Sequence, residues 1–249
     1  MPAICSEWRD LPYREIWAVD CEYYPGAGLA NGGTSGDRIT PLCLVALEMR
    51  SGGLVRLWQG ELGPFAPYRL DGEALIISFN LAAEFSFHLA QRWGQPACAV
   101  DAYVEFRHLV NDGSIKSGDR PKGFHSIDGA LRYFCEDAVD SAYDKDAARD
   151  RILRGPPFSA AEQQELMDYC CDDVRKLAKL IPHIVPTIRS LPHALMRAKV
   201  QWAIAQQERR GVPLNAPLLA RTRDLTEPSR IPCVEGDSMW GCHEATGAS

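Results

Sequence analysis

Hydrophobic and polar positions divide the chain into a strand-rich first half and a helical second half. Short apolar runs bounded by Gly, Pro and polar turns predict strands at residues 15–23, 41–49, 54–59, 74–79 and 97–100. Apolar positions at helical spacing predict helices at residues 81–93, 102–110, 126–135, 159–181 and 191–210. Ser159 and Glu162 form a capping-box pattern, and Gly211 suits the position after a helix end. The pattern therefore predicts an α/β protein.

The order of these elements predicts a mixed sheet flanked by helices. The second and third strands are separated by Ser51, Gly52 and Gly53, which favours an antiparallel meander. Strands followed directly by helices favour crossover units and parallel pairing. We expect this sheet in a domain over residues 1–188, followed by a helical extension over 189–226 and an irregular tail over 227–249.

Composition narrows the class of protein. The 249 residues are 46% hydrophobic, enough for one sizeable core and an appendage. Nine cysteines are scattered without the spacing of a zinc site, and the charged N-terminal segment has no signal-peptide pattern. The apolar runs are too short to cross a bilayer. We therefore expect a globular cytoplasmic protein with reduced thiols and no membrane partner.

The net charge of −6 argues against binding to nucleic acid by bulk electrostatic attraction. Contact with phosphate would have to come from local basic groups. The candidates are Arg107, Lys116, Arg120 and Lys122, and then Arg149, Arg151, Arg154, Arg175, Lys176 and Lys179. Most of these side chains are expected to be ordinary solvated residues.

Asp20 and Glu22 are the first candidate functional pair. They stand two residues apart at the end of the first predicted strand, so both side chains leave the face that Ile16 and Ala18 also occupy. Two carboxylates in this position repel each other, and a bound divalent cation would relieve the repulsion. Taken alone, a solvated loop carrying two acids explains the pair equally well.

Two further pairs are spaced by four residues, so each pair lies on one face of a helix. Asn80 and Glu84 begin the helix after the fourth strand, where the roles of N-cap and first-turn acid would also account for them. Tyr169 and Asp173 lie inside the long helix, where a phenol one turn before a carboxylate can position a water on a metal. Core packing of Tyr169 and an ion pair between Asp173 and Lys176 is the simpler alternative.

In their order and context, the three pairs resemble the motifs of the DEDD exonuclease superfamily, in its tyrosine-bearing branch. The resemblance is specifically to the proofreading domain of DNA polymerase I-like enzymes, which carries D-x-E, N-x-x-x-D and Y-x-x-x-D. Here the second carboxylate is Glu84, where Asp is commoner. The resemblance covers residues 14–225 and extends through residues 99–107 and 145–155. Residues 208–215 look like the segment that leads into the polymerase domain, and we expect no polymerase domain after it.

This resemblance implies an RNase H-like fold, a 3′–5′ exonuclease activity and a two-metal site. Two Mg²⁺ ions, or Mn²⁺ in their place, would be held by the carboxylates of Asp20, Glu22, Glu84 and Asp173. Asp20 would be shared by both ions, and Tyr169 would orient the attacking water. Attack on the terminal phosphodiester would release a nucleoside monophosphate. Asp173 is preferred to Asp172 as a ligand because it alone stands four residues after Tyr169.

The expected substrate is a single-stranded or frayed 3′ end of DNA, in a proofreading role beside a separate polymerase. Asn80, Phe79 and Phe85 are candidates for contact with the terminal nucleotide, although core packing is the stronger expectation for both Phe residues. Two alternatives stay open. One is an RNA 3′ exonuclease of the RNase D type, which shares the three motifs, and the other is a non-catalytic remnant of a truncated polymerase that binds nucleic acid or a protein.

Overall fold

The fold is built around β1 (Glu15–Tyr24), whose apolar residues pack on both sides of a sheet. The computed structural model describes residues 7–26, 39–111, 120–134, 144–211 and 215–226. The other strands are β2 (Thr40–Glu48), β3 (Leu54–Trp58), β4 (Ala74–Ser78) and β5 (Ala99–Asp101). The strand order is β3-β2-β1-β4-β5, with antiparallel pairing from β3 to β1 and parallel pairing from β1 to β5. The predicted α/β class, the mixed sheet and the antiparallel meander are confirmed.

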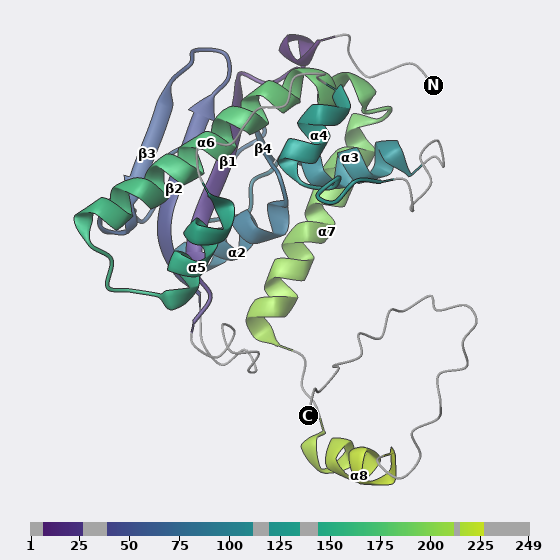
Figure 1. The fold of residues 1–249 in the computed structure, drawn as a ribbon. Coiled ribbons are helices and arrows are strands. Elements are labelled where there is room, and N and C mark those ends of the chain that lie inside the picture. Colours follow the sequence, from purple (N-terminus) through teal and green to yellow (C-terminus); the bar gives the residue numbers. More distant parts are fainter. Residues whose placement is uncertain (1–6, 27–38, 112–119, 135–143, 212–214, 227–249) are drawn as a thin grey trace. The chain divides into compact units, whose positions relative to one another are not determined.

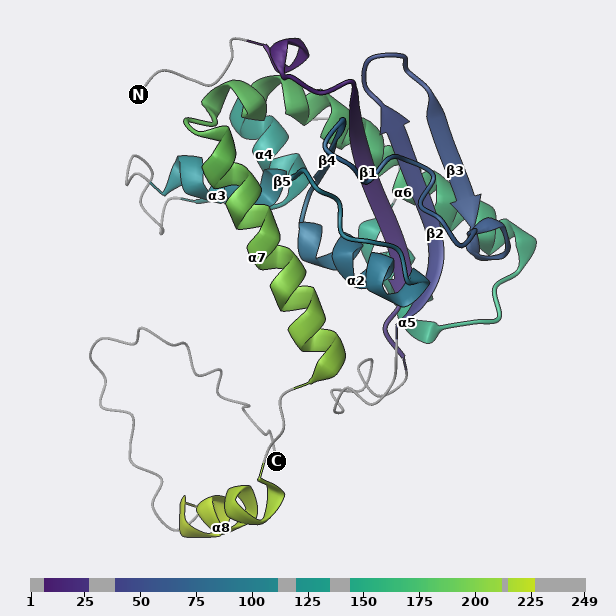
Figure 2. The same ribbon diagram turned by 180° about the vertical axis from the view of Figure 1, so that it is seen from behind.

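Helices cover both faces of the sheet (Figures 1 and 2). On one face lie α3 (Ala102–Val110), α4 (Ile127–Phe134) and α6 (Ala160–Ile184), and on the other α2 (Leu81–Gln91) and α7 (Leu191–Arg210). The remaining α-helices are α5 (Lys145–Arg154) and α8 (Ala216–Thr226), and single 3₁₀ turns occupy Trp8–Asp10, Gln59–Glu61 and Val185–Thr187. Alternation along β1 divides the core, because Ile16 and Ala18 belong to the cluster under α6 whereas Trp17 and Val19 belong to the cluster under α2.

The long helix α6 begins as its sequence predicts. The Ser159 hydroxyl accepts a hydrogen bond from the backbone N–H of Glu162. In turn, a carboxylate oxygen of Glu162 accepts a hydrogen bond from the backbone N–H of Ser159 at 2.8 Å. The helix continues to Ile184, a few residues beyond the predicted end, although Pro182 lies inside it. Because α6 packs against β1 and β2, tertiary burial holds this last turn in helical form despite the missing N–H of proline.

Contacts within the chain define a first unit that ends at Gly211 and a second unit that contains α8. α7 belongs to the first unit because it packs against α2 and β5. The expected tail over 227–249 and the Gly-rich segment over 27–36 lie outside the described residues. Among the described helices, none combines the length and the apolar character that crossing a membrane requires.

His88 makes the stability of this fold depend on pH. Its ring is 2% exposed, with Nε2 at 2.7 Å from the Tyr68 hydroxyl and Nδ1 at 3.1 Å from the carbonyl oxygen of Gly94. Burial lowers the pKa of His88 from 6.5 to about 4. A histidine buried in its neutral form contributes stability that is present above the unfolded pKa and is lost as pH falls towards the folded pKa. We expect His88 to account for a loss of about 3 kcal/mol in the free energy of unfolding between pH 7 and pH 4.

Urea unfolding of the wild type and of His88→Asn at several pH values measures this contribution. The variant is expected to be less stable at pH 7 but to lose less stability on acidification. An identical pH dependence in both proteins would exclude His88 as the cause.

Candidate active site

Asp20 lies at the edge of the sheet where β4 ends. The parallel pairing of β1 with β4 ends at Ala18 and Ile77, so Asp20 stands two residues further along β1, level with the turn from β4 into α2. The carboxyl ends of the parallel strands β1, β4 and β5 meet at this edge. This is the edge at which open α/β sheets commonly bind their ligands.

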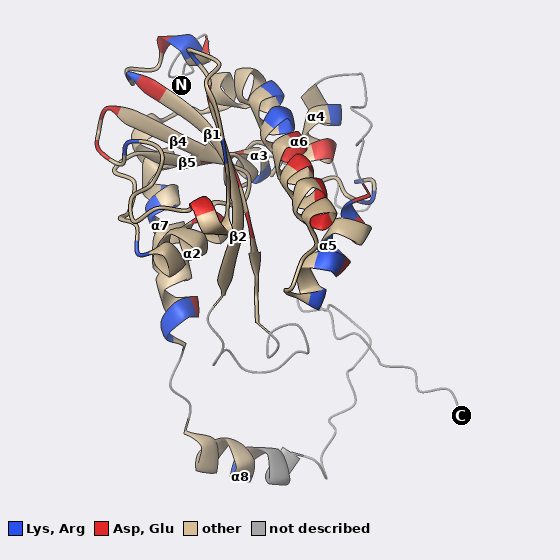
Figure 3. Cartoon of the chain, turned by 90° about the vertical axis from the view of Figure 1, so that its left-hand side faces the viewer, with Lys and Arg blue, Asp and Glu red and all other residues tan. Residues whose placement is uncertain are grey.

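The structure brings four predicted carboxylates within electrostatic reach of one another. Burial, followed by the negative charge of Asp173, raises the pKa of Asp20 to about 8. Burial and the charge of Asp20 also raise the pKa of Glu22 well above its ordinary value, and Asp173 and Glu84 add to the effect. Burial and then Asp20 raise the pKa of Glu84, which is 3% exposed. Because such effects weaken with distance, acids from β1, α2 and α6 form one cluster. Figure 3 shows acidic positions on α6 and in α2, with strands of the sheet between them in that view.

Tyr169 lies beside Asp173, as their spacing of four residues in a helix predicts. Its ring is half-buried and packs against a small cluster that contains Leu42 and Ile152. Burial, followed by the charge of Asp173, raises the pKa of Tyr169, so the phenol keeps its proton. Burial raises the pKa of Asp173, although hydrogen bonding from Tyr169 and two lysine ammonium groups oppose the shift. Tyr169 therefore combines the predicted core packing with a polar contact to the acidic cluster.

Two lysines neutralise part of the acidic cluster. Lys145 Nζ lies 3.3 Å from Asp173 Oδ1 and 2.9 Å from Asp128 Oδ2. Lys176, which is 1% exposed, places Nζ 2.8 Å from Asp172 Oδ2 and 3.1 Å from Asp128 Oδ1, but 4.0 Å from Asp173 Oδ1. The ion pair between Asp173 and Lys176 considered from the sequence is thus present only at long range, and it is buried. The closer partner of Asp173 is Lys145, which comes from α5.

Sequence reasoning gave no role to Lys145 or Asp128. Lys145 begins a stretch that resembles the exonuclease family, but nothing in its local pattern shows which acid it meets. Lys145 and Asp173 are far apart in the sequence, and their contact depends on how α5 packs against α6. Only the tertiary structure supplies that information.

Asp101, another residue for which no role was predicted, holds the starts of two helices together. Its carboxylate, 1% exposed, accepts the backbone N–H groups of Asn80 at 3.2 Å and Leu81 at 3.0 Å, where α2 begins. It also accepts those of Tyr103 at 3.0 Å and Val104 at 3.2 Å, where α3 begins. Asn80 makes no side-chain cap, because its backbone is left-handed, with φ 83° and ψ 62°. The exposed Asn80 side chain is therefore available for other contacts at the sheet edge.

The two Phe residues considered for nucleotide stacking differ in exposure. Phe85 is 1% exposed and packs edge-on against Trp202, with ring centroids 5.1 Å apart. Its ring therefore has a core role and offers no open face. Phe79 is half-buried and meets Tyr103 edge-on at 5.5 Å between centroids, so part of its ring lies at the surface.

The donor chemistry of the cluster suits a hard divalent cation. All of its ligand atoms are oxygens, which Mg²⁺ and Mn²⁺ prefer. Asp20 Oδ2 and Glu84 Oε2 are buried and have no hydrogen-bond partner among the described residues. However, in the described ranges no group of three or more His, Cys, Asp or Glu side chains is arranged so that it could hold a metal ion. The residues thus fit such an ion chemically, while binding it would require the side chains to draw closer together.

Comparison with models of protein families and with curated protein sequences finds no match to this chain. The assignment of a function therefore rests on the residues and their arrangement.

Proposed function

We propose that the protein is a metal-dependent 3′–5′ exonuclease that acts on single-stranded or frayed DNA ends and has an RNase H-like fold. One observation carries the proposal: Asp20, Glu22, Glu84 and Asp173 come from three separate elements and form one cluster of like charge beside Tyr169, in which Glu84 is buried and the other three are half-buried. Grouping like charges in this way is costly, and a bound cation would offset the cost. The five-stranded mixed sheet is compatible with the proposed fold.

In this proposal the four carboxylates hold Mg²⁺, or Mn²⁺ in its place. Bound divalent ions supply charge neutralisation at the phosphodiester and activation of a water molecule. Tyr169 keeps its proton and donates its hydrogen bond to Asp173, so its phenol oxygen would accept a hydrogen bond from that water beside Asp173. Buried apolar surroundings exclude bulk water from Glu84. Asn80, exposed at the start of α2, is placed to contact the terminal nucleotide.

A second candidate is a non-catalytic module that binds nucleic acid. It is favoured by the contact between Lys145 Nζ and Asp173 Oδ1 at 3.3 Å, since this ammonium group already provides a cation for one of the proposed ligands. In that case Lys145 would replace the metal rather than accompany it. The two candidates differ in whether the protein hydrolyses a nucleic-acid strand at all when a divalent ion is supplied.

Digestion of single strands labelled at the 3′ end tests the proposal. With Mg²⁺ the protein is expected to release labelled nucleoside monophosphate from DNA, and a chelator should stop the release, because the metal ions supply the lowered pKa of the water and the charge neutralisation at the phosphodiester. An RNA strand of the same sequence, run in parallel, separates a DNA exonuclease from an RNA-trimming enzyme. Absence of release with either strand in Mg²⁺ or Mn²⁺ would overturn the proposed activity in favour of the non-catalytic module.

A further inference from the structure

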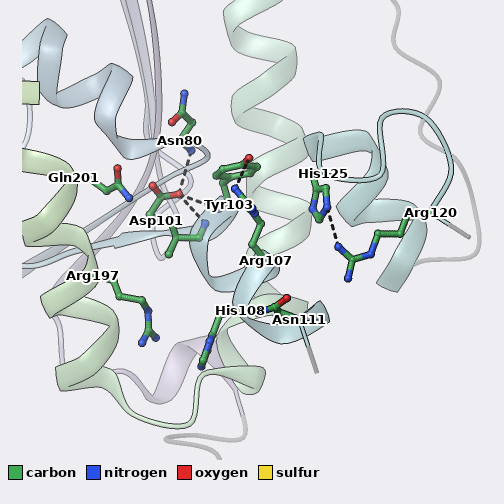
Figure 4. A pocket seen from close by; sticks show the side chains of 11 residues that line it. Asn80, Asp101, Tyr103, Arg107, His108, Asn111, Arg120, His125, Arg197 and Gln201 are labelled. Atoms are coloured by element: carbon green, nitrogen blue, oxygen red, sulfur yellow. Dashed lines mark hydrogen bonds between the residues drawn. The ribbon is translucent and has the colours of Figure 1, made fainter. Parts of the chain in front are cut away.

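A basic cavity lies beside the acidic cluster, at the carboxyl ends of β4 and β5. Its volume is about 410 Å³. Its lining residues come from the start of α2, from the length of α3, from α7 and from the segment before α4 (Figure 4). Asp101 forms part of the wall and also acts electrostatically on Glu84, so the cavity adjoins the candidate active site.

Three arginines, Arg107, Arg120 and Arg197, line the cavity. His108 and His125 lie beside them, but burial and the charges of Arg120 and Arg107 lower the pKa of His125, which favours its neutral form. The acids nearby are committed to other contacts. Asp101 accepts four backbone N–H groups, and Glu105 forms a two-point ion pair with Arg197 at 2.6 and 2.7 Å. The cavity therefore has an excess of positive charge.

Arg107 is the cation of this wall that is best placed to meet a ligand. Within the described part of the chain it has no carboxylate partner, and its contacts are with Tyr103, at 3.3 Å from the phenol oxygen and 5.5 Å from the ring centroid. Two other basic residues named from the sequence, Arg151 and Arg154, differ in this respect because they form ion pairs with Glu162 on α6. Arg107 is also exposed, so its side chain can be replaced without disturbing the core.

The opposite wall supplies further polar atoms. Arg120 donates to the carbonyl oxygen of Val110 at 2.8 Å and lies 3.3 Å from His125 Nε2. His125 Nδ1 is buried and has no hydrogen-bond partner among the described residues. Asn80 and Asn111 add amide groups to the rim. A cavity with several N–H donors and an excess of positive charge matches the oxygens of a phosphate group.

We infer that this cavity is a phosphate-binding subsite, in which Arg107 contacts a backbone phosphate of the strand whose 3′ end lies at the acidic cluster. The identity of the strand rests on the proposed function. If that function is set aside, the same basic cavity would bind the phosphate of a free nucleotide. Asn80 connects the two sites, because it lines the cavity and precedes Glu84 by one helical turn.

Binding measured without hydrolysis tests the inference separately from the activity. Fluorescence anisotropy of a labelled oligothymidylate is recorded in chelator, with the Asp20→Asn protein as the common background. Arg107→Gln is expected to weaken binding about tenfold, as loss of one charge-assisted contact does. It should also reduce the slope of log affinity against log salt by about 0.7, the value for one phosphate on a single strand. Arg107→Lys should restore part of the affinity.

Arg14→Gln is the matched control, since it removes the same charge from an exposed residue that precedes β1, at the end of that strand away from Asp20. Competition with thymidine 5′-monophosphate and with inorganic phosphate identifies the source of the phosphate. If Arg107 affects only the oligonucleotide, the cavity takes a strand phosphate; if it affects both ligands, the cavity also takes free nucleotide. Equal affinity of Arg107→Gln and Arg14→Gln for every ligand would overturn the inference, even if digestion by the wild type succeeds. Failure of digestion alone would leave this result unaffected.

Discussion

Asp20→Asn and Asp173→Asn are each expected to reduce Mg²⁺-dependent release of nucleotides by at least about 10³-fold. The two residues come from β1 and α6, yet the charge of Asp173 is a major cause of the raised pKa of Asp20. Each substitution removes one negative charge and one anionic oxygen ligand with almost no change in volume. Circular dichroism should show an intact fold, because Asn keeps the shape of Asp: Asp20→Asn relieves a like-charge repulsion, and Asp173→Asn weakens one contact, that with Lys145. Undiminished digestion by either variant would refute the assignment.

Asp172→Asn is the control for these substitutions. Asp172 neighbours Asp173 on α6 and carries the same charge, but its carboxylate lies 2.8 Å from Lys176 Nζ and has no place in the proposed site. This variant should keep its metal-dependent activity and lose some stability. Loss of activity equal to that of Asp173→Asn would show that the spacing from Tyr169 does not identify the ligand.

Lys176→Met is expected to have the largest effect on stability, a loss of about 3 kcal/mol or more in the free energy of unfolding. Lys176 Nζ is almost fully buried and lies within ion-pair distance of Asp172, Asp128 and Asp173, although these contacts lack hydrogen-bond geometry. Removing the ammonium group leaves several half-buried carboxylates without their central cation. Breaking a buried ion pair by deleting one partner is costly because the remaining charge is not solvated.

Urea unfolding at neutral pH measures this effect. Lys179→Met serves as the control, since Lys179 lies on the same helix but is exposed. Its substitution should change the free energy of unfolding by less than about 0.5 kcal/mol. If both variants were equally stable, Lys176 would not be the cation that stabilises Asp128 and Asp172 in the fold.

The regular elements were predictable because their apolar patterns are strong. The helices over Ala102–Val110 and Leu191–Arg210 have the predicted bounds, and the strands agree within about two residues. α5 was not predicted as an element, because its ten residues are mostly charged and bury only Ala148 and Ile152. With so few apolar positions, no helical period stands out.

The candidate site was only partly predictable. Pairs within one element, such as Asp20 with Glu22 and Tyr169 with Asp173, follow from strand and helix geometry. Contacts between elements do not follow from local spacing. The sequence could not show that Asp101 would cap two helices at once, in place of Asn80. Such contacts depend on how β4, β5 and their helices pack.

Titration with Mn²⁺ tests most directly whether the acidic cluster is a metal site. Calorimetry on the wild type should show saturable binding, and Asp20→Asn and Glu84→Gln should each weaken it at least about tenfold, because each removes an anionic ligand. Asp172→Asn should bind as the wild type does. Absence of saturable binding by the wild type, or binding that neither Asp20→Asn nor Glu84→Gln weakens, would contradict the account.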